Sequence, residues 1–244
     1  MRGVFVLLLM LAAALASAQG GPPLLTDDPG TVDPGKWEIN ISWVNRTFPG
    51  RIENELPHLD ASHGFTGNAQ YKIEAPWVFA SGDGRSANGD GGGSTGIKWR
   101  FVNAKGGRPA VSIYPQIGFS IAPRSVRLGL SDGGTSLLLP IEVEWDLFHL
   151  SVNADFGALI QAGSGPGWMG GIAVGHEVGG TEYLAEIHGE GTPSDRESLW
   201  VAQVGMRHDF GKRATLLVAF GRSFAGTETD PIRWTSYLGI QLHY

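Results

Sequence analysis

The stretch KWEINISW, residues 36–43, decides the fold class. Side chains of a β-strand point alternately to its two faces, so a strand with unlike faces shows a period of two in its sequence. Here one set is apolar and the other polar: Trp37, Ile39, Ile41 and Trp43 against Glu38, Asn40 and Ser42. The apolar face must turn either toward a protein core or toward lipid.

The same alternation recurs along most of the chain. In residues 69–79, for example, Tyr71 and Trp77 share one face, while Lys72 and Glu74 share the other. Segments of about ten residues with this period, separated by turn residues, are typical of transmembrane barrels. We therefore predict an all-β fold, a closed antiparallel up-and-down transmembrane β-barrel of about twelve strands. The expected strands are 36–47, 53–64, 69–79, 95–102, 109–121, 135–145, 149–160, 168–177, 181–189, 198–210, 214–224 and 232–244.

The composition agrees with this class. The chain has 244 residues, of which 17% are charged, and it contains no cysteine. Soluble domains carry about 25% charged residues. Without cysteine the protein has neither disulfides nor a thiolate metal site. The net charge of −6 predicts no nucleic-acid partner, and we expect no cofactor and no metal.

The first residues are typical of a secretory signal peptide. Residues 1–18 begin with one basic residue, continue with a short apolar run and end in Ala-Ser-Ala. A membrane anchor is the alternative, but the run is shorter than the ~20 residues that a spanning helix needs. The barrel is expected to occupy residues 36–244.

Residues 19–35 are rich in proline, glycine and aspartate. Such residues punctuate loops, so we expect a periplasmic turn-rich lead-in to the first strand. The alternative is a plug folded into the periplasmic mouth, with Asp27, Asp28 and Asp33 reaching basic side chains inside.

The expected connections alternate between short and long along the chain. In outer-membrane barrels the short turns are periplasmic and the long loops external. This asymmetry predicts the bacterial outer membrane of a Gram-negative envelope, with both termini in the periplasm.

The tryptophans favour lipid over a protein core. By parity all eight fall on the apolar faces, most of them near a strand end, where an indole can lie at the headgroup level. A sandwich core is the alternative, but it gives Trp no reason to prefer strand ends. The expected aromatic girdle is Trp37, Trp43, Trp77, Trp99, Trp145, Trp168, Trp200 and Trp234.

The last strand ends at the aromatic Tyr244, preceded at alternate positions by Leu242 and Ile240. This resembles the C-terminal signal by which outer-membrane barrels are recognised by their assembly machinery. The resemblance implies that machinery, and outer-membrane lipid, as partners.

Three stretches carry a family resemblance: LLTDDPGTVDPGKWEINISW, RIENELPHLD and YKIEAPW, all within residues 24–79, with GTSLLLP at 134–140 in support. They resemble bacterial outer-membrane β-barrel proteins assigned a transport role, of the phenol-degradation MetA-pathway type. The resemblance implies a barrel that transports a small molecule. The chain departs from the pattern at His63, where an aromatic residue is expected, and in its glycine-rich loop 80–94.

The polar faces should line a narrow lumen, because about twelve strands enclose less space than a sixteen-stranded porin. Excess carboxylates favour cations. The alternative is that the charges pair across strands and fill the interior. The expected lumen-lining charges are Glu38, Asp60, Lys72, Glu74, Lys98, Arg100, Glu142, Glu144, Asp155, Glu182, Glu186, Arg207 and Arg233.

No motif is specific enough to predict an enzyme. His58, Asp60 and Ser62 follow one strand face at about 7 Å spacing, too far apart for a catalytic triad. Residues 92–96 match G-x-S-x-G, but in a loop that leads into a strand. We expect a passive channel or transporter for small solutes. A lumen-filled structural or adhesive barrel is the alternative, and a barrel phospholipase is less favoured.

Overall fold

The computed structural model describes residues 21–161, 165–193, 197–228 and 230–244. The predicted signal peptide, residues 1–18, lies outside them, as do residues 19 and 20. Among the described residues, no helix combines the length and apolarity needed to cross a membrane.

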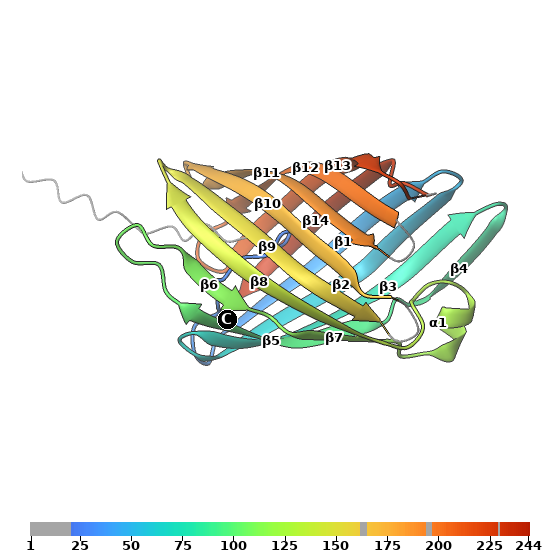
Figure 1. Ribbon diagram of the computed structural model, residues 1–244, viewed down its shortest axis with the longest axis horizontal. Helices are drawn as coiled ribbons and strands as arrows, with labels where there is room; N and C mark the ends of the chain where they lie inside the picture. The colour runs from blue at the N-terminus through green and yellow to red at the C-terminus, as the bar shows by residue number, and fades with distance from the viewer. Residues whose placement is uncertain (1–20, 162–164, 194–196, 229) are drawn as a thin grey trace, which may run out of the picture.

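The described chain forms an antiparallel barrel of fourteen strand segments and one short helix (Figure 1). The strands lie in chain order around the barrel, as predicted for an up-and-down topology. Their bounds are β1 Trp37–Phe48, β2 Arg51–Thr66, β3 Ala69–Gly82, β4 Arg85–Asp90, β5 Gly93–Val102, β6 Ala110–Ile113, β7 Gln116–Phe119, β8 Thr135–Leu147, β9 Leu150–Gln161, β10 Gly167–Val178, β11 Thr181–Thr192, β12 Glu197–Asp209, β13 Ala214–Gly226 and β14 Trp234–His243.

These segments occupy twelve positions, because two positions are interrupted. β4 and β5 follow one another along β3, and β6 and β7 follow one another between β5 and β8. Proline at 115 explains the second break, since it has no N–H to donate to a neighbouring strand. The predicted twelve-stranded barrel is confirmed.

The barrel closes where β1 pairs with β14. Ten residue pairs join these strands, from Glu38–His243 to Thr47–Trp234. Closure pairs the first strand with the last, so that β4, which pairs with β3 alone, carries the one strand edge left open among the described residues; strands that cross lipid need such pairing.

Residues 80–94, expected to be a glycine-rich loop between two strands, instead hold the end of β3, a tight turn and all of β4. β3 continues to Gly82, turns tightly at Asp83 and Gly84, and pairs back with β4. Both turn residues have positive φ, a conformation that glycine and aspartate tolerate. Helix α1, Pro123–Arg127, packs beside β4, and the Ser125 hydroxyl donates to an Asp90 carboxylate oxygen at 2.7 Å.

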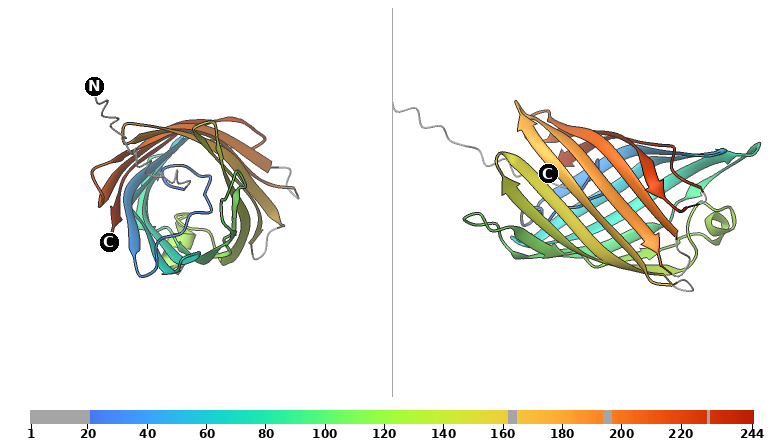
Figure 2. Two further views of the ribbon diagram at one scale, coloured as in Figure 1. Left: turned by 90° about the vertical axis from the view of Figure 1, so that its left-hand side faces the viewer. Right: turned by 45° about the horizontal axis from the view of Figure 1, so that its top comes forward.

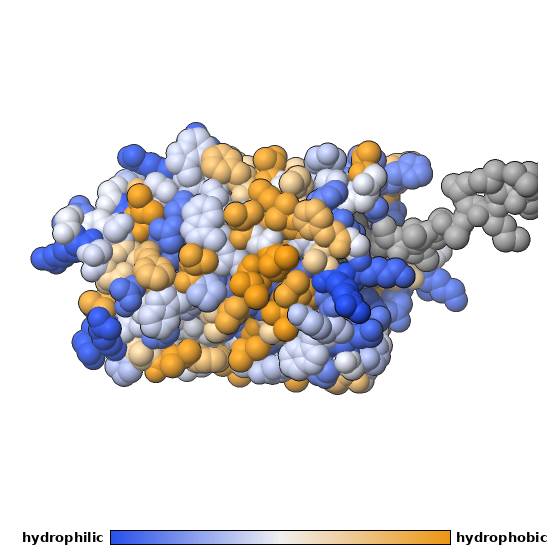
Figure 3. Space-filling model, turned by 180° about the vertical axis from the view of Figure 1, so that it is seen from behind, coloured by the Kyte–Doolittle hydropathy of each residue, from blue (hydrophilic) through white to orange (hydrophobic). Residues whose placement is uncertain are grey.

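The two faces of the wall differ as the alternation predicts. On the outer face Ile172 and Val204 are 58% and 61% exposed. On the inner face Glu142 and Asn153 are 0% and 2% exposed. Apolar side chains gather over the middle of the outer wall, with polar side chains toward both ends (Figure 3).

An arginine in the middle of this outer wall should destabilise a lipid-facing barrel. We expect Ile172→Arg to lower the free energy of unfolding in lipid vesicles by about 2–4 kcal/mol, because the charge enters hydrocarbon. Val178→Arg, at the end of the same strand and 56% exposed, is the matched control, with a loss of about 0–1 kcal/mol. Urea titrations of both variants measure the difference. Equal losses would contradict a wall that faces lipid.

Candidate functional site

Residues 21–32, here called the lumenal segment, lie inside the ring of strands (Figure 2). Leu24, Thr26 and Asp28 in this segment are 7%, 0% and 5% exposed. The expectation of a lead-in without a lumenal role is therefore corrected for these residues. They turn back into the barrel before β1 begins, and the alternative of a plug describes them better.

Two wall carboxylates hold the segment by its backbone. The Glu186 carboxylate on β11 accepts the N–H of Leu25 at 2.9 Å and that of Thr26 at 2.9 Å. Asp155 on β9 accepts the N–H of Asp27 at 3.1 Å. Charge-assisted hydrogen bonds of this kind are stronger than neutral ones, so the loss of either carboxylate should loosen the segment.

Two basic side chains of the wall also hold the lumenal segment. Lys98 on β5 pairs with the Asp27 carboxylate at 2.9 Å and donates to the carbonyl of Asp28. Arg207 on β12 donates to the carbonyls of Gly21 and Pro22, each at 3.0 Å. The segment thus receives charged partners from opposite sides of the barrel and spans the lumen.

Other predicted lumen charges pair with one another. Lys72 lies 3.0 Å from an Asp60 oxygen and 3.1 Å from a Glu74 oxygen. Lys98 lies 3.2 Å from Glu142, which also accepts the hydroxyl of Ser112 at 2.5 Å. These contacts agree with the alternative of charges paired across strands.

The remaining predicted lumen residues differ in burial. Glu182 is part-buried and lies 3.3 Å from Arg207. Glu38, Arg100 and Glu144 are half-buried at inward positions of their strands. Arg233 directly precedes β14 and is exposed at the barrel end. Its place in the lumen stays a prediction.

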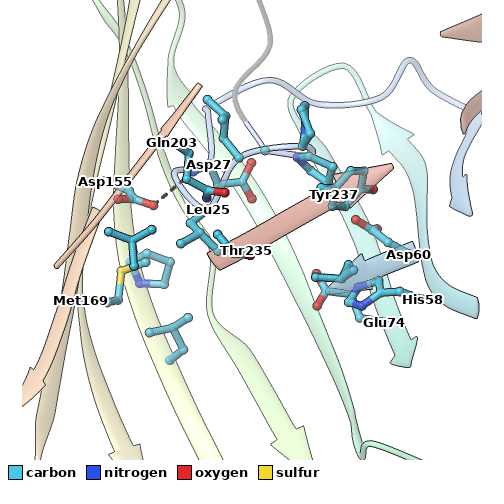
Figure 4. A pocket seen from close by; sticks show the side chains of 18 of the residues that line it. Leu25, Asp27, His58, Asp60, Glu74, Asp155, Met169, Gln203, Thr235 and Tyr237 are labelled. Atoms are coloured by element: carbon cyan, nitrogen blue, oxygen red, sulfur yellow. Dashed lines mark hydrogen bonds between the residues drawn. The ribbon is translucent and has the colours of Figure 1, made fainter. Parts of the chain in front are cut away.

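A cavity of about 300 Å³ remains beside the lumenal segment. In Figure 4, Leu25 and Asp27 lie between Asp155 on one side and Asp60 on the other. Tyr114 also lines this cavity; it is 1% exposed, and its hydroxyl has no partner among the described residues. The lumen therefore keeps small pockets but is obstructed by the segment.

All eight tryptophans lie at outward positions of their strands. Trp37, Trp77, Trp99, Trp145 and Trp234 are exposed on this outer face. The other three, Trp43, Trp168 and Trp200, are half-buried. Trp168 and Trp200 pack against each other with ring centroids 5.6 Å apart. None of the eight belongs to the buried hydrophobic residues.

Two further kinds of site, a metal centre and a catalytic His-Asp-Ser row, can be checked in the described residues. No group of three or more His, Asp or Glu there could hold a metal ion. His58 contacts a Glu55 carboxylate oxygen at 2.5 Å, and Glu55 also pairs with Arg46. This cluster belongs to the inner wall, and Ser62 is not part of it.

The sequence analysis missed three polar side chains of the lumen. Gln70 accepts the N–H of Val32 at 2.7 Å, and Gln203 donates to Glu186 at 2.6 Å. Tyr114 lies between Lys72 and Lys98, whose ammonium groups are 5.9 and 5.2 Å from its ring centroid. All three have inward parity, but a search restricted to charged residues passes over them.

No protein-family model and no curated protein matches the sequence. Among solved structures, the chain is similar to an outer membrane channel from Pseudomonas putida F1, with a TM-score of 0.75 and 12% identity over 89% of this chain and 98% of that one. The NanC porin gives 0.60 and 9%, over 84% and 99%. The translocator domain of the autotransporter NalP from Neisseria meningitidis gives 0.55 and 12%, over 88% and 91%. At these identities the likeness establishes the fold and not the activity.

The anchoring of the lumenal segment can be measured with one introduced thiol, since the chain has no cysteine of its own. In Thr26→Cys the thiol should react slowly with a water-soluble maleimide, because position 26 is 0% exposed. Adding Glu186→Ala should raise the labelling rate about tenfold, the effect of losing roughly 1.4 kcal/mol of anchoring. Glu177→Ala, an exposed carboxylate on β10, is the control and should leave the rate unchanged. Equal rates in all three proteins would contradict the anchoring.

Proposed function

We propose that the chain is a bacterial outer-membrane channel for small solutes, closed by its own lumenal segment. The observation that carries the proposal is the closed barrel with an apolar outer wall and a charged, partly hollow interior. Strands can cross hydrocarbon only when their backbone groups are paired, and this wall meets that condition. The solved outer-membrane structures of similar fold support the same setting.

The proposed orientation places the short turns and both termini in the periplasm, as in other outer-membrane barrels. The five exposed tryptophans near the strand ends then form the lipid-facing girdle together with the half-buried Trp43, Trp168 and Trp200. The final strand, which ends at Tyr244, is the part that we expect the barrel assembly machinery to recognise.

The solute remains a class rather than a compound. The resemblance of residues 24–79 to transport proteins of the MetA-pathway type supports a small catabolic solute. The free space beside the lumenal segment, about 300 Å³, fits a small molecule, since ligand sites usually measure about 300–1,000 Å³.

Deleting residues 21–32 should open the passage. In planar lipid bilayers we expect the intact protein to give brief or small conductance steps and the deletion variant to give larger, longer ones, because the obstruction is gone. A variant that retains the segment but carries Glu177→Gln should behave as the intact protein does. A folded deletion variant that neither conducts nor lets liposomes swell would end the channel proposal.

A second candidate function has one specific observation in its favour. The segment fills much of the lumen and is anchored by Glu186, Asp155, Lys98 and Arg207. A structural or adhesive barrel, which acts through its loops and never opens, would be built in this way. Absence of conductance in the deletion variant, with unchanged solute uptake by cells that lack the chain, would favour it. A lipid-hydrolysis assay separately tests the less favoured phospholipase.

The open channel should prefer cations, because carboxylates outnumber basic groups on its inner face. Glu74 and Glu144 lie on the inner face at positions that are half-buried rather than fully enclosed. In the deletion variant, Glu74→Gln with Glu144→Gln should lower the K⁺ over Cl⁻ permeability ratio by about twofold. Reversal potentials in a KCl gradient measure it, with Glu177→Gln as the control. A ratio that does not move would place the selective charges elsewhere.

A further inference from the structure

A second cavity of about 400 Å³ adjoins the first, with which it shares Leu25, Leu138 and Met169, and it opens toward the barrel end that carries the long loops. Leu25 of the segment lines it together with apolar side chains of the wall, among them Leu138, Met169 and Leu199. These residues come from β8, β10 and β12. Met169 and Leu199 lie directly opposite Glu190 of β11 in the strand register, so apolar side chains flank this carboxylate on both neighbouring strands.

The mouth of the same cavity is acidic. Glu190, Glu197 and Glu228 line it, and all three are exposed. No Lys or Arg is present among its described lining residues. Burial, with the nearby charges of Glu190, Glu197 and Asp230, raises the pKa of Glu228 above its ordinary value. Crowded like charges favour the binding of a compensating cation.

A buried polar atom points to a ligand independently of these carboxylates. His188 on β11 lines the cavity and is 6% exposed, yet its Nε2 has no hydrogen-bond partner among the described residues. Buried polar atoms are seldom left without a partner. A neutral imidazole nitrogen that carries no hydrogen accepts hydrogen bonds, so a bound N–H group would satisfy it.

The size and chemistry of the cavity favour an organic cation over a metal ion. The described residues hold no group of three His, Asp or Glu close enough to bind a metal ion. A volume of about 400 Å³ accommodates a molecule of several carbon atoms rather than a single ion.

We propose that this cavity binds an amphipathic organic cation, with its primary ammonium group between Glu190 and His188, its apolar body against Leu138, Met169 and Leu199, and Glu197 and Glu228 adding negative charge at the mouth. The site goes beyond the proposed channel function. It exists whether or not the barrel conducts, so binding can be measured without any conductance.

The test uses three probes of one shape: 2-phenylethylammonium, neutral 2-phenylethanol and anionic phenylacetate. Isothermal titration calorimetry of the full chain in a nonionic detergent, with protein-free micelles as the blank, measures each affinity. We expect the ammonium to bind at least about tenfold more tightly than the alcohol, since charge-assisted hydrogen bonds add to the shared apolar contact. Phenylacetate should bind most weakly. Equal affinities for ammonium and alcohol, or no binding of any probe, would overturn the proposal.

Matched variants locate the site. The triple variant Glu190→Gln, Glu197→Gln and Glu228→Gln should bind the ammonium about tenfold more weakly. The control variant Asp33→Asn, Asp146→Asn and Glu177→Gln removes the same charge from exposed positions outside the cavity, and its affinity should stay within about twofold of the intact protein. Equal losses in both triple variants would show a general charge effect and reject the site.

The role of His188 can be separated from a purely structural one by comparing the affinities of two related cations. His188→Phe should weaken binding of 2-phenylethylammonium and leave that of its N,N,N-trimethyl analogue unchanged, because the trimethyl form has no N–H to donate. If a triple variant fails to fold, the affinities of His188→Phe for the two cations still test whether the ammonium binds in this cavity. An equal change for both cations would reject the role of Nε2.

Discussion

The pairing of β1 with β14 is the constraint on which the rest of the structure depends. Peptide groups that face hydrocarbon have no water to bind, so each must find a partner in a neighbouring strand. An open sheet of this length would leave two unpaired edges. Once β1 and β14 are joined, the outer face can be apolar and the inner face is free to carry charge. Because the barrel is closed, the two sets of alternating side chains face two separate environments, one outside the wall and one in the lumen.

That freedom creates a second requirement inside. A narrow lumen cannot hold many unpaired charges, because each one loses its water on burial. The lumenal segment supplies part of the answer, since its backbone N–H groups satisfy Glu186 and Asp155 and its carbonyls satisfy Arg207. The wall charges that contact the segment are thereby satisfied by its backbone groups rather than by water.

The sequence predicts the wall better than its contents, for a physical reason. Alternation is local, so the pattern around Trp37 and Trp43 already assigns two faces and a strand. The contact between Leu25 and Glu186 joins residues 161 positions apart, and no local pattern encodes it. At Arg233 the parity argument extends past the start of β14 at Trp234. Residues 80–94 were misread because glycine and aspartate seldom form strands, whereas pairing with β3 overrides that preference.

For a related reason, the sequence predicts which charged residues face the lumen but not which of them contact one another. The charged positions Asp60, Lys72 and Glu142 were assigned to the inner face from their spacing alone, and they lie there. Whether Lys72 would meet Asp60, or Lys98 would meet the lumenal segment, depends on strand register and on a segment without periodicity. Register is set by the whole ring rather than by any one strand.

The short helix α1 has a consequence for how separate molecules meet. β4 pairs with β3 alone, so one side of it carries backbone groups with no neighbouring strand. Such an unpaired strand edge can pair with a strand of another molecule and is a common site of aggregation. The Ser125 hydroxyl donates to Asp90 and lies over Gly89, so α1 covers one face of β4 and leaves its unpaired edge as the place where a second strand could add.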